Sequence, residues 1–454
     1  MPDETVHDLY RLQPQEVEAP PSTLFDILRR IGPGLILASS IVGSGELIAT
    51  TVLGAQNGYT LLWLILISCI IKTAVQNELG RYSIGTGETT LEAFDRVPGP
   101  RFRVSWVVWM WLLMVTMTLM QIGAMMGGIA EILSGIVPGV STNVWVWLIA
   151  GVTMVLLILG RYNMVEKVAL GLVVSFTVLT VSCAVLLFKR PEFFSWGSVL
   201  DGLSFHMPSG GIFTAVATFG ITGVGATELV GYPYWCIEKG YARYTGQRDD
   251  SGAWLGRAFG WIRVMGVDVI NSMFIYTFAT VAFYFLGAGI LHGMGIVPQG
   301  SEMVAMLSSM YTETLGGWSL YLFLLGAFAV LYSTLFASTA GNSRVLADMV
   351  GMLGAYKRTD YAMRLRVTQT SVVLLLAVPA IFFMFVGEPV LMVTIGGVAQ
   401  ALMLPVIGFV TLYLRYRHLP QSIAPKGWLT LALWVSAVVM GVMMSYSVVY
   451  RLTG

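Results

Sequence analysis

The sequence predicts an all-α membrane protein with eleven transmembrane helices. Of its 454 residues, 56% are hydrophobic and only 11% are charged, whereas soluble domains contain roughly 25% charged residues. Apolar runs of about 18 residues or more, long enough to cross a bilayer as a helix, recur along the whole chain. The excess apolar surface must face lipid, so we expect a multi-pass protein of the cell membrane.

Eleven apolar ranges are expected to cross the membrane: residues 25–56, 60–80, 105–134, 143–160, 164–188, 210–238, 255–288, 317–343, 366–387, 390–414 and 428–450. The first five (25–188) and the next five (189–414) would form two repeats, and residues 415–454 a linker with an accessory eleventh span. Because each repeat has an odd number of spans, the second would be inverted relative to the first. Residues 1–24 are polar and contain proline, so we expect a disordered cytoplasmic tail.

The charged loops predict the orientation of the chain. Loops that face the cytoplasm carry an excess of Lys and Arg. With the N-terminus inside, only Lys189, Arg190 and Arg451 of the 26 Lys and Arg residues lie outside, and Lys72 lies within a span. We therefore expect a cytoplasmic N-terminus and a C-terminus on the outer side.

One short pattern occurs in both the first and the sixth span. It reads I-V-G-S-G-E-L at residues 41–47 and I-T-G-V-G-A-T-E-L at residues 221–229. Paired glycines allow a helix to come apart, and a carboxylate inside the membrane needs a partner. Interrupted helices at corresponding places in two repeats are the best sequence pointer to a transport site. Glycine pairs in membrane helices are also packing contacts, which is the alternative for each copy.

The two interruptions predict a substrate-binding site at the middle of the membrane. Its expected members are Gly43, Ser44, Gly45, Glu46, Gly223, Ala226, Thr227, Glu228 and Gln400. Glu46 and Glu228 would each begin a second half-helix, where the positive helix end favours an ionised carboxylate. Two carboxylates and freed carbonyls form an oxygen-only donor set, which suits a hard divalent cation such as Mg²⁺, Mn²⁺ or Ca²⁺.

Two further charged residues are candidate coupling or charge partners. Lys72 is functional by position. It is either a fixed positive charge in place of a coupling cation or the partner of Glu46 or Glu228. Asp268, in the seventh span, either lines a proton or water path or makes a polar cap or interhelical hydrogen bond.

Several segments resemble the Nramp family of metal transporters. They are residues 69–91 (C-I-I-K-T-A-V-Q-N-E-L-G-R-Y-S-I-G-T-G-E-T-T-L), 160–162 (G-R-Y), 338–341 (S-T-A-G) and 400–405 (Q-A-L-M-L-P). The resemblance extends over roughly residues 30–415. It implies a LeuT-like fold with inverted repeats and broken first and sixth helices, and a divalent metal as transported substrate with no cofactor. It also implies that Gln400 lies within a turn of a site-facing glutamine.

The candidate site departs from the pattern of that family. The family's D-P-G-N is here G-S-G-E at residues 43–46, and its A-x-x-M-P-H is here A-T-E-L-V-G at residues 226–231. Leu229 stands where the family has a methionine sulfur, and Gly231 replaces the histidine linked to proton movement. The family's acidic residues in the third span fall at about Gly123 and Met126. The resemblance therefore implies a divergent member that prefers a hard cation and has lost proton coupling.

Two other functions fit the same architecture. One is transport of an organic cation, amino acid or amine, with Tyr232, Tyr234 and Trp235 as a cation–π wall. The other is a non-transporting sensor. No nucleophile–base pair or phosphate loop indicates an enzyme, and no basic domain indicates a nucleic-acid partner. We expect a monomer whose partners are the cation and the lipid bilayer.

Overall fold

Helices make up nearly all of the computed structural model, which describes residues 8–160, 162–207, 211–425 and 427–453. Nine helices of this part are long and apolar enough to cross a membrane. They are α2 with η2 and α3 (Pro33–Ile41, Val42–Thr50, Thr51–Asn57), α4 (Leu62–Thr86), α6 (Trp106–Ile136), α10 with α11 (Ile212–Ile221, Ala226–Lys239), α13 with η3 (Gly252–Leu286, Gly287–Leu291), α15 (Ser319–Met352), α16 (Tyr361–Val386), α17 (Pro389–Arg417) and α18 (Trp428–Thr453).

Two further apolar helices, α7 (Thr142–Ile158) and α8 (Tyr162–Leu187), lie at the remaining predicted ranges. The connections contain η1 (Pro14–Glu16), α1 (Leu24–Arg30), α5 (Thr90–Asp95), the paired strands β1 (Arg101–Phe102) and β2 (Val104–Ser105), α9 (Trp196–Asp201), α12 (Tyr241–Thr245), η4 (Gly300–Glu302) and α14 (Met303–Leu315). Residues 1–7 of the expected tail and Arg161 of the second resembling segment lie outside the described residues. The all-α membrane architecture agrees with the prediction.

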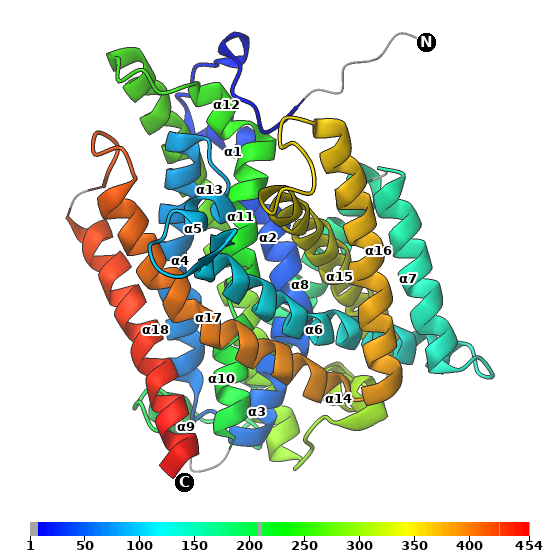
Figure 1. Cartoon of the computed structure of the whole chain (residues 1–454). Coiled ribbons are helices and arrows are strands. Elements are labelled where there is room, and N and C mark those ends of the chain that lie inside the picture. Colours follow the sequence, from blue (N-terminus) through cyan, green and yellow to red (C-terminus); the bar gives the residue numbers. More distant parts are fainter. Residues whose placement is uncertain (1–7, 161, 208–210, 426, 454) are drawn as a thin grey trace.

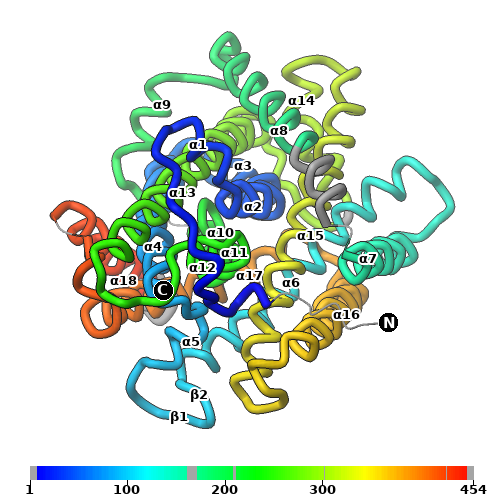
Figure 2. The backbone as a smooth tube through the Cα atoms, turned by 90° about the horizontal axis from the view of Figure 1, so that it is seen from above, coloured from blue at the N-terminus to red at the C-terminus, as the bar shows by residue number. Residues whose placement is uncertain are grey.

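The first and sixth spans form the centre of the helix bundle (Figures 1 and 2). In the first span, 89% of an apolar stretch of 18 residues is buried inside the protein, compared with 22% of the corresponding stretch in α18. α18 packs on α17 and α4 at the edge of the bundle (Figure 1). The peripheral place of α18 suits its expected accessory role. The first span is buried on all sides, as expected for a helix that lines a path through the protein.

The first span is not unwound at residues 43–45, which corrects the predicted broken first helix. α2 continues through η2, a π-helix, into α3. The hydroxyl of Thr51 donates to the carbonyl of Glu46 (3.2 Å). The hydroxyl of Thr50 lies 3.0 Å from the carbonyl of Gly45 and 2.9 Å from the carboxylate of Glu46, and its single proton serves one of them at a time. Because these bonds help to satisfy the wider turns, the helix continues instead of opening. Glu46 therefore lies inside a continuous helix and not at the start of a second half-helix.

Gly43 is a packing glycine. A side chain at this position would overlap Thr334 of α15. Small residues allow such close approach between membrane helices. In the first copy of the repeated pattern, Gly43 is therefore a contact between helices.

The sixth span is broken, as predicted. α10 ends at Ile221 and α11 begins at Ala226. Gly223 between them has a φ of 67°, which side chains other than glycine rarely adopt. A side chain at Gly223 would also lie 2.9 Å from Cα of Cys69 on α4. Backbone conformation and close packing both require glycine here.

The described part of the N-terminal segment, residues 8–23, contacts the ends of the helices, while the disorder expected for residues 1–24 stays a prediction. It runs across the end of the bundle that carries α1 and α12 (Figure 2). The hydroxyl of Tyr10 donates to Glu238 at the end of α11 (2.7 Å), and Glu16 pairs with Arg243 of α12 (2.9 Å). The segment is polar, but its polar groups have partners on the helix ends, which its composition alone does not reveal. We call this end the N-terminal face.

A buried carboxylate, Asp348, joins four elements near the same face. It accepts hydrogen bonds from the hydroxyls of Thr89 (2.6 Å) and Tyr234 (2.7 Å). It also pairs with Arg358 (3.0 Å) and Arg364 (3.4 Å), and only 1% of its side chain is exposed. The carboxylate therefore connects the start of α5 with α11, α15 and α16.

We predict that Asp348→Ala strongly destabilises the protein. Removal of one partner from a buried ion pair leaves the other charges uncompensated and costs about 3–5 kcal/mol. The apparent melting temperature in detergent should fall clearly, and Asp348→Asn should give an intermediate value. Arg248→Ala removes an exposed partner of Asp250 and should leave the melting temperature nearly unchanged. Equal melting temperatures for Asp348→Ala and the wild type would contradict this role.

Candidate functional site

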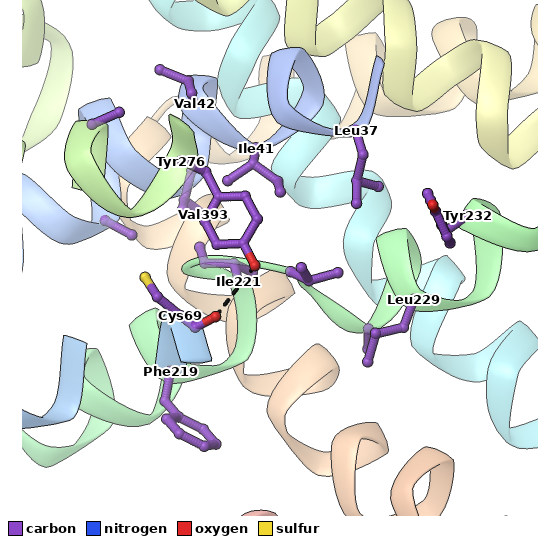
Figure 3. Close-up of a cluster of buried hydrophobic side chains, with 14 of the residues drawn as sticks. Leu37, Ile41, Val42, Cys69, Phe219, Ile221, Leu229, Tyr232, Tyr276 and Val393 are labelled. Atoms are coloured by element: carbon purple, nitrogen blue, oxygen red, sulfur yellow. Dashed lines mark hydrogen bonds between the residues drawn. The ribbon is translucent and has the colours of Figure 1, made fainter. Parts of the chain in front are cut away.

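Apolar side chains surround the interruption of the sixth span (Figure 3). Phe219 and Ile221 lie on its α10 side and Leu229 on its α11 side, while Ile41 of α2 faces them. Leu229 is fully buried. The position at which the resemblance implies a methionine thus carries a packed aliphatic side chain without a donor atom.

A chain of hydrogen bonds runs through this apolar region and connects four helices. Gln121 of α6 donates to the hydroxyl of Ser44 in η2 (2.7 Å), and Gln400 of α17 donates to the side-chain oxygen of Gln121 (2.9 Å). The Gln400 oxygen accepts from the backbone N–H of Thr227 (3.2 Å). The Thr227 hydroxyl lies 2.7 Å from Glu228 and 3.1 Å from Gln400, and its single proton serves one of them at a time.

Glu228 lies at the end of this chain and lines a small cavity. Its Oε1 is 3.4 Å from the hydroxyl of Ser40, which is 3.1 Å from the hydroxyl of Ser338. The cavity has a volume of about 20 Å³ and is lined by Ile36, Leu37, Ser40, Thr227, Glu228, Gly231, Trp235, Ala337, Ser338, Gly341 and Asn342. These residues belong to α2, α11 and α15, so the cavity lies between the interruption and the N-terminal face.

Glu46 has a different set of partners. Its Oε1 accepts from the backbone N–H of Gly223 (3.2 Å) and its Oε2 from the hydroxyl of Thr50 (2.9 Å). The Thr50 hydroxyl also lies 2.9 Å from that of Thr222. Glu46 is fully buried, and these bonds connect the π-helix of the first span with the interruption of the sixth.

The two carboxylates thus have separate hydrogen-bond partners in this conformation. The part of the chain that the structure describes contains no group of three or more His, Cys, Asp and Glu side chains placed to hold a metal ion. Glu228 lines the cavity and Glu46 does not. The joint metal site expected from the sequence stays a prediction.

Lys72 is bonded to carbonyl oxygens and not to a carboxylate. Its ammonium donates to the backbone carbonyls of Phe219 and, at 2.8 Å, of Thr222. Among the described residues, no ion pair joins Lys72 to Glu46 or Glu228. Of the two sequence alternatives, the contacts favour a fixed charge at the interruption.

Asp268 caps the first span. Its carboxylate accepts from the backbone N–H groups of Gly32 (3.1 Å) and Gly34 (2.5 Å) at the start of α2, and from the hydroxyl of Tyr232 (3.1 Å). The first N–H groups of a helix have no partner within the helix, and a carboxylate there satisfies them. These contacts agree with the polar cap expected as one alternative for Asp268, the other being a proton or water path.

Sequence reasoning missed Gln121 and the placement of Ser40. Gln121 is polar in a long apolar helix, which is a signal of an interhelical hydrogen bond. It also lies two positions before Gly123, where the resemblance implies an acidic residue. Ser40 carries no such signal because serine is common in helix interfaces.

Comparison with known proteins gives the family. The profile described as "Natural resistance-associated macrophage protein-like" (Nramp) matches residues 34–450. The chain belongs to the Nramp family. An uncharacterised protein of Pasteurella multocida is 23% identical over 439 residues, which cover 93% of each chain. The divalent metal cation transporter MntH of Aeromonas hydrophila is 27% identical over 347 residues, which cover 75% of this chain and 78% of MntH.

Solved structures support the fold of this Nramp-family protein. A variant of the Eremococcus coleocola manganese transporter superposes with a TM-score of 0.61 at 16% identity, covering 96% of this chain and 90% of that one. MhsT, solved with L-phenylalanine, gives a TM-score of 0.57 at 15% identity, with coverage of 95% and 99%. At these identities the likeness concerns the fold alone, which is LeuT-like. The predicted family and the expectation of a transporter instead of an enzyme are confirmed.

We predict that Gly225→Ala disturbs the site. A Cβ at this position would overlap Glu228 and lie 2.5 Å from the side-chain oxygen of Gln400, so both side chains must move. Overpacking of this kind costs about 1–3 kcal/mol, and the apparent melting temperature should fall. Gly151→Ala is the matched control, because a Cβ at this mid-helix glycine meets no atom within 4 Å. An unchanged melting temperature for Gly225→Ala would show that the site is looser than described.

Proposed function

We propose that this Nramp-family protein is a secondary transporter or uniporter for a divalent metal cation. The observation that carries the proposal is the carboxylate of Glu228, which lines a cavity next to the broken sixth span. A buried acid in a membrane protein requires a partner, and a transported cation provides one. Relatives named as divalent metal cation and manganese transporters support this substrate class.

The donor set favours a hard cation, with Mg²⁺, Mn²⁺ or Ca²⁺ as candidates. Around the cavity, Ser40, Thr227, Glu228 and Ser338 offer only oxygen atoms. Oxygen ligands suit these ions, whereas thioether and imidazole ligands suit softer ones. Leu229 offers neither, so nothing in this set selects for a soft transition metal.

Glu46 is the second carboxylate of the proposal. Both of its oxygens are already bonded in this conformation, to Gly223 and Thr50. It would become a ligand only when a movement at the interruption breaks these bonds. Alternating access in broken-helix transporters involves such movements around a site at the middle of the membrane.

The cavity argues against the second candidate, an organic cation or amine. Its volume of about 20 Å³ holds little more than a water-sized particle, whereas pockets for organic ligands have roughly 300–1,000 Å³. The ring of Trp235 has the guanidinium of Arg344 at 4.6 Å from its centroid. Tyr232 and Tyr234 are buried, with their hydroxyls bonded to Asp268 and Asp348, and this packing argues against an open cation–π wall.

The remaining expectations belong to the same proposal. These are eleven spans, inverted repeats at 25–188 and 189–414, a linker and accessory span at 415–454, a cytoplasmic N-terminus, an external C-terminus and a monomeric state. Matching helices at all eleven ranges support the number of spans. The distribution of Lys and Arg supports the orientation.

Glu228→Gln should reduce divalent cation uptake into proteoliposomes by at least about tenfold, because affinity for a hard cation depends on the number of charged ligands. Uptake of Mn²⁺ and Mg²⁺ is measured with a trapped metal-sensitive dye. Glu192→Gln changes an exposed glutamate that pairs with Arg190 and should transport like the wild type. Unchanged uptake by a folded Glu228→Gln protein would refute the site, and uptake of amines without metals would favour the second candidate.

Metal influx should proceed without acidification of the vesicle interior. Gly231 stands where the resemblance implies a proton-linked histidine, so this position has no group to titrate. Pyranine trapped inside the liposomes reports the internal pH during Mn²⁺ uptake, and an imposed pH gradient should not change the uptake rate. Acidification that follows metal influx would show that proton coupling has been kept by other groups.

A further inference from the structure

The end of α10 presents backbone carbonyls that lack their usual helical partners. Within a helix, the carbonyl of Phe219 would accept from the N–H of Gly223. That N–H instead donates to Glu46 (3.2 Å). Thr222 is the residue after the last helical turn, so its carbonyl is also free of an intrahelical bond.

The ammonium of Lys72 occupies the space between these two carbonyls. It donates to Thr222 O (2.8 Å) and to Phe219 O, and it lies 5.0 Å from the centroid of the Phe219 ring. The hydroxyl of Ser68 lies 3.0 Å from Thr222 O and 3.2 Å from Phe219 O, and its single proton serves one of them at a time. Lys72 is fully buried. The buried ammonium is therefore held by neutral oxygens, a ring face and the negative end of a helix.

We propose that the end of α10 is a monovalent-cation site that the protein fills with its own Lys72 ammonium. Unwound carbonyls and the C-terminal ends of half-helices are the groups that coordinate Na⁺ in transporters with broken helices. An ammonium group and a monovalent metal ion carry the same charge and are both satisfied by carbonyl oxygens. The hydrogen bonds that the structure gives the Lys72 ammonium go to these carbonyl oxygens.

The covalently attached charge has a consequence for coupling. A cation that cannot leave carries no gradient energy, so flux through the proposed metal site should not depend on Na⁺ or K⁺. Only this consequence rests on the proposed function. Occupancy of the carbonyl site is measured by ion binding alone, so the failure of one proposal is distinguishable from the failure of the other.

The test is direct binding of ²²Na⁺ and of Tl⁺, a K⁺ analogue, to purified protein in detergent. The wild type should show no saturable binding, and Lys72→Ala should bind about one ion per chain, with a higher melting temperature in NaCl than in choline chloride. Lys72→Ala combined with Ser68→Ala reports whether the neighbouring hydroxyl contributes to the site, with weaker binding expected. Lys189→Ala, which removes an exposed lysine, should behave like the wild type.

Two results would overturn the proposal. One is a folded Lys72→Ala protein that binds neither ion and is not stabilised by them. The other is saturable Na⁺ or Tl⁺ binding by the wild type. Divalent uptake by the wild type that depends on either gradient would overturn the consequence for coupling alone. Saturable binding by the wild type would overturn the proposal even if the lysine variant does not fold.

Discussion

The hydrogen bond from the Gly223 N–H to Glu46 is the constraint on which the centre of this structure depends. It joins the π-helix of the first span to the interruption of the sixth. Because Gly223 no longer donates to Phe219, a carbonyl at the end of α10 becomes available for Lys72. This one contact thus relates the interruption of the sixth span, the position of the Lys72 ammonium and the bonded state of Glu46.

Much of the fold follows from the sequence because membrane spans are long and apolar, and their ranges agree with the observed helices. The form of the interruptions does not follow, since glycine permits both an unwound turn and a π-helix. At residues 43–45 the outcome depends on Thr50 and Thr51, whose hydroxyls satisfy displaced carbonyls, and on Thr334 of a distant helix. At Gly223 the positive φ opens the chain.

The sequence named some residues that lie together in the structure, but it did not predict the contacts that connect them. Thr227, Glu228 and Gln400 do come together, and the amide of Gln121 links Gln400 to Ser44, so that the chain of bonds joins four helices. Such contacts join residues far apart in the sequence, which neither hydrophobic periodicity nor a local motif encodes. The same holds for the segment at residues 8–23, whose partners lie on α11 and α12.

The two copies of the repeated pattern have different physical roles because their surroundings differ. Glu46 is fully buried and satisfied by a backbone N–H and a hydroxyl. Glu228 and Gly231 line the same cavity. A Cβ at Gly231 would meet no atom within 4 Å, so the space beside Glu228 is open at this position. A carboxylate with open space beside it can exchange an ion with its surroundings, whereas one bonded on both oxygens resists such exchange. Selectivity of the proposed site therefore depends first on Glu228 and its hydroxyl neighbours, and access to Glu46 depends on how readily the Gly223 bond opens.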